Sequence, residues 1–191
     1  MANQDNPIGV RPLTMLDGSQ IPVRRFIVDS GNGTNLGIGD VVETVAAGAV
    51  NKITDFTANP TRIVGAVIGL EDSNGVAIGG PNSTVSTKYL PLSTAGFAYV
   101  ALALPNATFV AQVATGQTPA EADIFSASDL VAGTLDTTTA LSRNELAALS
   151  TGQANCRVIG KIDDPSNAWG EHVDCVITFI ESIWNGASAG V

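Results

Sequence analysis

Residues 156–184 constrain the fold more than any other stretch of this chain. The first arm, residues 156–162, is rich in β-branched residues, and the second, residues 172–182, alternates apolar with polar side chains. Residues 163–171 between them contain Asp, Pro, Ser, Asn and Gly, which are turn formers. Two β-rich arms around such a segment predict antiparallel strands joined by a long loop.

The first arm has an earlier counterpart in the chain. Residues 61–67 and 156–162 share an Arg, two aliphatic residues and a Gly, with another aliphatic residue two positions later. A glycine inside a strand is typical of a bend or of a close backbone approach. We therefore expect Gly65 and Gly160 to mark two strands that use one architectural device twice.

Short β-rich runs separated by turn signals recur along the rest of the chain. They predict strands at residues 21–29, 38–43, 50–57 and 62–70, a short strand around Tyr89, and a hairpin of residues 96–104 and 108–113. Both faces of that hairpin are apolar, so we expect it to be buried on both sides. The pattern predicts an all-β fold: an antiparallel β-barrel or sandwich with long loops.

Helix signals are sparse. Residues 118–130 are the best helix candidate, because Thr118 can cap, Pro119 fits the first turn and Glu121 has capping-box spacing; an extended conformation fits nearly as well. Residues 142–149 fit either a helical turn or a strand. We expect at most one or two short helices.

The predicted organisation has three parts. Residues 1–20 form an extended, irregular N-terminal arm, whose Ile8, Val10 and Leu13 are able to dock on a neighbour. Residues 21–184 form the β domain. An alternative organisation of this domain is a small barrel with an inserted hairpin region around residues 86–150. Residues 185–191 form a flexible tail.

The composition limits the classes of partner. Charged residues are 14% of the 191, below the roughly 25% of soluble domains, and the net charge is −9. No cluster of Lys and Arg is present, so we expect no nucleic-acid binding and no polybasic membrane contact. The N-terminus lacks the apolar core of a secretory signal, and no run reaches membrane-spanning length. Few charges suit a protein whose faces are covered by partners; a neutral-surfaced monomer is the alternative.

Candidate chemistry is scarce. His172 is the single histidine, and the nearby acids Asp163, Asp164, Glu171 and Asp174 offer a calcium site or, as we favour, an acidic solvated loop. No Gly-x-Ser-x-Gly elbow exists, and a strand spacing of three residues places His172 and Cys175 on opposite faces. The glycine-rich residues 30–37 lead into a strand-like run rather than a helix, which favours a turn over a phosphate loop. We predict no catalytic residue, no cofactor and no metal.

The two cysteines lie on opposite arms of the C-terminal hairpin. Symmetric pairing about the loop places Cys175 opposite Gly160 rather than Cys156. A disulfide therefore needs a slipped register, and we favour two reduced, buried thiols.

Five residues are candidate partner contacts. Arg24 and Arg25 are adjacent in a predicted strand and point to opposite faces, so that one can turn toward an interface while both can also be solvated. Trp169 and Trp184 occupy exposed-looking positions, which suits either an interface or the covering of a barrel end. Arg11, in the N-terminal arm, completes the set.

Segments spread over nearly the whole chain resemble, in order, the small capsid decoration (cement) proteins encoded beside the major capsid protein in tailed bacteriophages. The resembling segments are residues 6–12, 38–42, 63–69, 122–123, 129–134, 157–160 and 164–170. The acidic, cysteine-bearing last strand and the Ala-rich residues 96–113 depart from the family pattern.

The resemblance implies a structural virion protein, not an enzyme, on the exterior of an icosahedral capsid. Such a protein would be assembled in the host cytoplasm, would bind the major capsid protein and neighbouring copies of itself as a homo-oligomer, and would stabilise the shell against packaged DNA. An acidic protein also suits the outer face, because packed DNA would repel it inside. The rival hypotheses are a phage fibre- or receptor-binding-associated β module and a hydrolase whose site the sequence hides.

Overall fold

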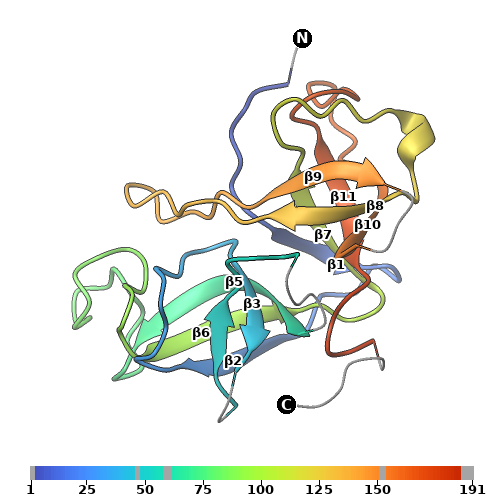
Figure 1. Ribbon diagram of the computed structural model, residues 1–191. Coiled ribbons are helices and arrows are strands. Elements are labelled where there is room, and N and C mark those ends of the chain that lie inside the picture. Colours follow the sequence, from blue (N-terminus) through green and yellow to red (C-terminus); the bar gives the residue numbers. More distant parts are fainter. Residues whose placement is uncertain (1–2, 46–47, 58–61, 151–153, 186–191) are drawn as a thin grey trace.

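The computed structural model describes residues 3–45, 48–57, 62–150 and 154–185, and it is all-β, as predicted (Figure 1). A six-stranded antiparallel sheet has the order β1 (Arg11–Met15), β7 (Ala107–Gln112), β11 (Asp174–Phe179), β10 (Cys156–Lys161), β8 (Ala127–Val131), β9 (Glu145–Ser150). A five-stranded sheet has the order β2 (Val23–Val28), β6 (Gly96–Leu102), β5 (Ile63–Asp72), β3 (Val41–Thr44), β4 (Val50–Lys52). The arrangement is sandwich-like, and neither ladder closes into a barrel within the described residues.

The C-terminal hairpin is confirmed, with one change of register. Strands β10 and β11 pair antiparallel, and a bulge between Val158 and Gly160 places Cys175 opposite Lys161 rather than opposite Gly160. The extra residue in β10 accounts for that shift of one position. Cys156 pairs with Phe179, and both cysteines are free and buried, as predicted.

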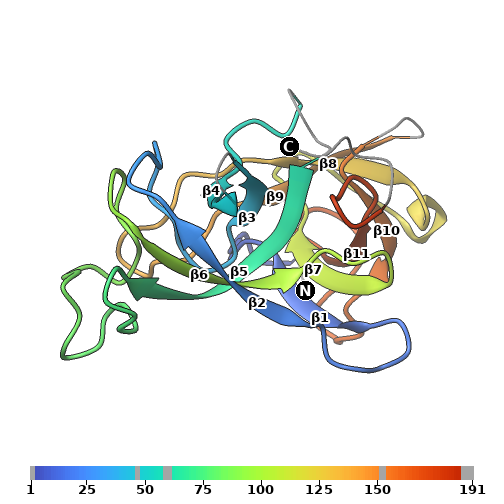
Figure 2. The same cartoon turned by 90° about the horizontal axis from the view of Figure 1, so that it is seen from below.

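The expectation of one shared device is confirmed, because in each echo strand the glycine follows one extra, bulged residue: Val64 in β5 opposite β3, and Ile159 in β10 opposite β11. The surroundings of the two glycines differ. At Gly65 in β5, an added Cβ would lie 1.9 Å from the backbone oxygen of Ala101 in β6, which makes this a site of close backbone approach. At Gly160 in β10, no atom lies within 4 Å of such a Cβ. Figure 2 shows the curvature of β5, which contains a second bulge between Val67 and Gly69.

The predicted hairpin of residues 96–104 and 108–113 was wrong, because its two strands belong to different sheets. Strand β6 lies between β2 and β5, whereas β7 lies between β1 and β11. The chain crosses over at residues 103–106, where Ala103 donates its N–H to Val64 of the five-stranded sheet and Ala107 donates to Leu104. The prediction that these strands are buried holds best for β7, in which every residue is buried.

For residues 118–130, which the sequence left open between a helix and an extended conformation, the structure favours the extended alternative. Only a 3-10 turn forms, at Glu121–Asp123, and the Asp123 carboxylate accepts the backbone N–H of Ala120 at 2.8 Å. This local bond stabilises a single turn, and Ala127–Val131 then pairs with both β10 and β9. For residues 142–149 the sequence allowed either a helical turn or a strand, and the structure places the start of strand β9 there.

The N-terminal segment does not form a wholly irregular arm. Arg11–Met15 pair with β7 as an edge strand, where Pro12 is tolerated, and Val10 is fully buried in this chain's own core. The five strands of the second sheet all lie between residues 23 and 102. Of the predicted tail, only Asn185 lies within the described residues, where it donates to backbone oxygens of Phe179 and Ile180.

One apolar core lies between the two sheets, with Val41, Ala66 and Ala101 from the five-stranded sheet and Phe109, Val158 and Ile177 from the six-stranded sheet. A second apolar core belongs to the five-stranded sheet. In the six-stranded sheet, Phe109 and Phe179 pack edge to face with 5.0 Å between ring centroids, and half-buried Leu104 packs against both cores. Besides the crossover, the β8–β9 connection hydrogen-bonds to Ile38, and Ile183 in the C-terminal segment donates to Ile63. Within the described ranges, no helix is sufficiently long and apolar to span a bilayer.

Candidate functional site

Strand β2 carries two of the five predicted contact residues, and both are exposed. Arg25 donates from Nε to Glu71 Oε2 at 2.8 Å, and its guanidinium carbon lies 3.4 Å from the ring centroid of Phe97. Tyr99 donates to the other oxygen of Glu71 at 2.9 Å. This hydrogen bond, together with burial and the charge of Glu71, raises the pKa of Tyr99. A cation thus lies flat on an aromatic ring, fixed by a shared carboxylate.

These side chains belong to one surface, which we call the β2–β6 face and define as Val23, Arg25, Ile27, Phe97 and Tyr99. The register pairs Arg25 with Tyr99 and Ile27 with Phe97, which places these side chains on one side of the sheet. Val23 is 41% exposed and Ile27 is 52% exposed. The face therefore combines accessible aliphatic side chains with a preorganised arginine.

The other predicted contact residues have partners within the chain. Arg11 on β1 forms an ion pair with Asp174 at 3.1 Å, and the Trp184 indole N–H donates to the backbone oxygen of Val64 at 2.9 Å. Trp169 is half-buried against the core between the two sheets. Among the described residues, no hydrogen bond or ion pair joins Arg11, Arg24, Arg25, Trp169 and Trp184 to one another.

Phe125 is an exposed aromatic residue that the sequence did not single out. It is 72% exposed and has a positive φ of 75°, which non-glycine residues rarely adopt. Its backbone N–H donates to Val158 at 2.8 Å, so the residue is held to β10 while its ring faces solvent. Phe125 lies within residues 118–130, where the sequence favoured a helix, so its exposure in an irregular segment was not expected.

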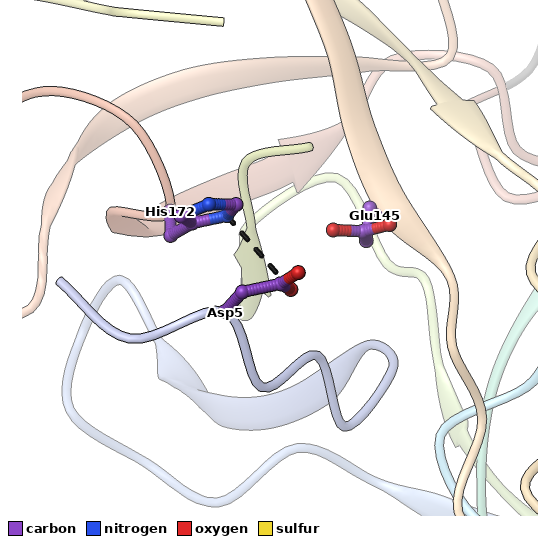
Figure 3. Close-up of side chains that lie close together, drawn as sticks. All are labelled: Asp5, Glu145 and His172. Atoms are coloured by element: carbon purple, nitrogen blue, oxygen red, sulfur yellow. Dashed lines mark ion pairs between the residues drawn. The ribbon is translucent and has the colours of Figure 1, made fainter. Parts of the chain in front are cut away.

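The acids considered for a calcium site have separate partners. Asp174 binds Arg11, and Asp164 accepts hydrogen bonds from Ser166, which lower the pKa of that carboxyl. Within the described chain, the group that comes together is Asp5, Glu145 and His172, whose potential ligand atoms all lie within 4.8 Å of one another (Figure 3). Residues so far apart in the chain share no motif spacing, so no sequence signal could have identified them.

The cysteines are poor nucleophiles. Burial first, and neighbouring negative charges second, raise the pKa of Cys156 far above its usual range. Burial also raises the pKa of Cys175 to about 12. Because the thiolate is the reactive form, neither side chain offers nucleophilic chemistry in the folded chain.

A cavity of about 420 Å³ lies between Gly33, Thr34 and Lys52 on one side and Gly133 and Leu135 on the other. The glycine-rich residues 30–37 and the β8–β9 connection thus line the same cavity. Residues 30–37 lead into β3 and not into a helix. The Lys52 ammonium is already engaged, because it lies 2.8 Å from Asp40 and donates to Gly133 O at 3.1 Å. The cavity therefore lacks a free cation to bind a phosphate.

Comparison of the chain with protein-family models, with curated proteins and with solved structures finds no match.

Proposed function

We propose that this chain is a structural virion protein that binds the exterior of an icosahedral phage capsid and stabilises contacts between major capsid protein subunits. Support from the sequence comes from the ordered segments that resemble capsid decoration proteins, which run from residue 6 to residue 170. In this proposal the chain is not an enzyme, and its surfaces, rather than a catalytic pocket, perform its function.

The β2–β6 face is the observation that carries the proposal. Protein interfaces are centred on apolar and aromatic side chains and are enriched in Arg. Here Val23 and Ile27, 41% and 52% exposed, flank Arg25, which is already held by Glu71 and Phe97. Because the arginine is fixed before binding, less side-chain entropy is lost on docking.

The charge balance supports an outer location. A net charge of −9 would be repelled by packaged DNA inside a shell, and the outer surface avoids that repulsion. With only 14% charged residues, the chain also has few charges to desolvate when a face is covered.

Exposure gives an order of priority among the contact residues of this proposal. Arg24 and Arg25, on exposed β2, remain contact candidates, and Phe125 joins them. Arg11, Trp169 and Trp184 come second: Arg11 and Trp184 are partly exposed but bonded within the chain, and Trp169 is half-buried. Contacts with neighbouring copies add small areas that the repeated lattice multiplies.

Co-sedimentation tests the proposal. Purified chain is mixed with expanded, undecorated shells of the phage that encodes it, and its mass in solution is measured by light scattering. We expect saturable binding at a fixed ratio to capsid subunits and a higher melting temperature of the shell. Absence of binding to intact expanded shells would overturn the proposal, and binding to purified tails or to host cells instead would favour the fibre-associated alternative.

A further inference from the structure

Three segments that are distant in the chain bring an imidazole and two carboxylates together. Asp5 comes from the N-terminal segment, Glu145 begins β9, and His172 lies immediately before β11. One potential ligand atom from each lies within 4.8 Å of the others, and Figure 3 shows the three side chains facing a common space.

Hydrogen bonds on both sides of Asp5 hold its segment in place. The Asn3 side chain donates to the backbone oxygens of Ala168 and Glu171, at 2.8 Å each, and accepts the N–H of Ala168. On the other side of Asp5, the Gln112 side-chain oxygen accepts the N–H of Asn6 at 2.9 Å. Asp5 is therefore presented by a fixed stretch of backbone, although its own side chain is 56% exposed.

Glu145 and His172 are positioned by the six-stranded sheet. Glu145 pairs with Val131 in the β8–β9 ladder, and the next residue, Leu146, is fully buried. His172 has a positive φ of 58°, and its side chain is only 13% exposed. The imidazole is thus held between the β10–β11 loop and the N-terminal segment.

The imidazole lacks the hydrogen bond that burial normally requires. His172 Nδ1 is inaccessible to solvent and has no hydrogen-bond partner, and the nearest carboxylate oxygen, Asp5 Oδ1, is 3.9 Å away. This distance is too long for a hydrogen bond. Two ligands at about 2.0–2.2 Å from a tetrahedral zinc ion lie roughly 3.3–3.6 Å apart, so the two atoms would share an ion after a small movement of the exposed Asp5 carboxylate.

The charge of Glu145 is only partly compensated by its neighbours. Burial first, and the negative charge of Asp5 second, raise the pKa of Glu145, while His172 and Arg143 act in the opposite direction. A cation among these groups would satisfy the imidazole nitrogen and neutralise both acids. The exposed Asp5 carboxylate can rotate to shorten the remaining distances.

We propose that Asp5, Glu145 and His172 bind a divalent transition-metal ion, with zinc the best match to one imidazole and two carboxylates. Calcium and magnesium fit less well, because both prefer all-oxygen ligand sets. The ion would cross-link the N-terminal segment to β9 and to the β10–β11 loop, as a structural clamp. The inference does not depend on the proposed function.

Metal binding is tested on the full chain expressed without a polyhistidine tag. The chain is treated with chelator, and Zn²⁺ is then titrated by calorimetry and by thermal unfolding. We expect one Zn²⁺ per chain and a rise in Tm that excess chelator reverses. Mg²⁺ at the same concentrations should leave Tm unchanged.

Variants assign the site. His172→Gln and Asp5→Asn should each weaken Zn²⁺ binding about tenfold or more. Asp163→Asn, an exposed acid in the same loop as His172, is the matched control and should bind like the unaltered chain. Because Asp5 is largely exposed, its variant should remain folded without metal, as circular dichroism would verify.

Cobalt provides a second readout. Co²⁺ in a site with an imidazole ligand should give visible absorption bands that are lost in His172→Gln. No Zn²⁺ binding, or binding that Asp5→Asn and His172→Gln leave unchanged, would overturn the proposal.

Discussion

Lys52 and Asp40 form a buried ion pair, with 2.8 Å between Nζ and Oδ1 and with side chains that are 6% and 0% exposed. The second oxygen of Asp40 accepts the Gly37 N–H at 2.8 Å, and Lys52 donates to Gly133 O at 3.1 Å. Together these bonds connect β4 to the turn before β3 and to the β8–β9 connection. The pair therefore fixes the β8–β9 connection on the five-stranded sheet.

Lys52→Met should lower the free energy of unfolding by about 3–5 kcal/mol, because it leaves the Asp40 carboxylate buried without its cation. Urea denaturation measures the change. Arg11→Met is the control: it breaks the Arg11–Asp174 pair, whose side chains are 42% and 32% exposed, and should cost about 1 kcal/mol or less. Equal costs for the two variants would contradict the assigned role of Lys52.

Gly65→Ala should destabilise the chain by about 3 kcal/mol or more, because its Cβ would lie 1.9 Å from the Ala101 backbone oxygen. Gly160→Ala, at the matching position of the echo strand, meets no atom within 4 Å and should change stability by less than about 1 kcal/mol. Thermal unfolding of the two variants side by side provides the comparison. Similar losses would show that the close approach of Ala101 does not distinguish Gly65 from Gly160.

Asp72 should make the stability of the five-stranded sheet depend on acid pH. Its carboxylate accepts the N–H groups of Thr84, Val76 and Asn74, and the Thr84 and Val76 bonds dominate in depressing its pKa well below the ordinary 3.8. Since the folded pKa is the lower one, the stabilisation is complete above pH 4 and is lost as the pH falls toward the folded pKa. Asp72→Asn should thus lower Tm by several degrees at pH 7, and the difference from the unaltered chain should shrink below pH 4. A difference that grows in acid would contradict this sign.

Both thiols should resist labelling in the folded chain. Cys156 and Cys175 are buried, and burial raises the pKa of both, so little thiolate is present at pH 8. An aromatic disulfide reagent should react with two thiols per chain in urea and, without urea, only at the rate of unfolding. Fast labelling under native conditions would show that this part of the six-stranded sheet opens locally.

Ile27→Asp should abolish shell binding while leaving the chain folded, because a charge in the β2–β6 face must be desolvated on docking. Val131→Asp, at another exposed aliphatic residue that is 45% exposed, is the control and should still bind. Co-sedimentation measures binding, and circular dichroism measures folding. If Val131→Asp loses binding and Ile27→Asp keeps it, the contact lies on the six-stranded sheet instead.

Local patterns in the sequence predicted strands well but not their partners. The alternation of β10 and β11 and the turn formers between them identified a real hairpin. The same reasoning failed for β6 and β7, because an apolar strand that is buried on both sides carries no mark of which sheet it joins. The crossover depends on backbone bonds to Val64, about forty residues earlier in the chain.

The candidate sites show the same limit. Arg25 was identified from its place in a strand, yet its partners Glu71 and Phe97 follow from the register of three strands. The Asp5–Glu145–His172 cluster spans most of the chain, so its members meet only once the fold is complete. Tertiary pairing, which no local propensity encodes, determines both arrangements.

The crossover between β6 and β7 has a consequence for the order of events during synthesis. Strands β2 to β6 are consecutive, so the five-stranded sheet has all its strands once residue 102 has left the ribosome. Strand β1 pairs only with β7, at residues 107–112, and must wait unpaired while some ninety residues are translated. Strand β1 is thus made before the five-stranded sheet and docks after that sheet has all its strands, which exposes the apolar residues of β1 to other nascent chains for that interval.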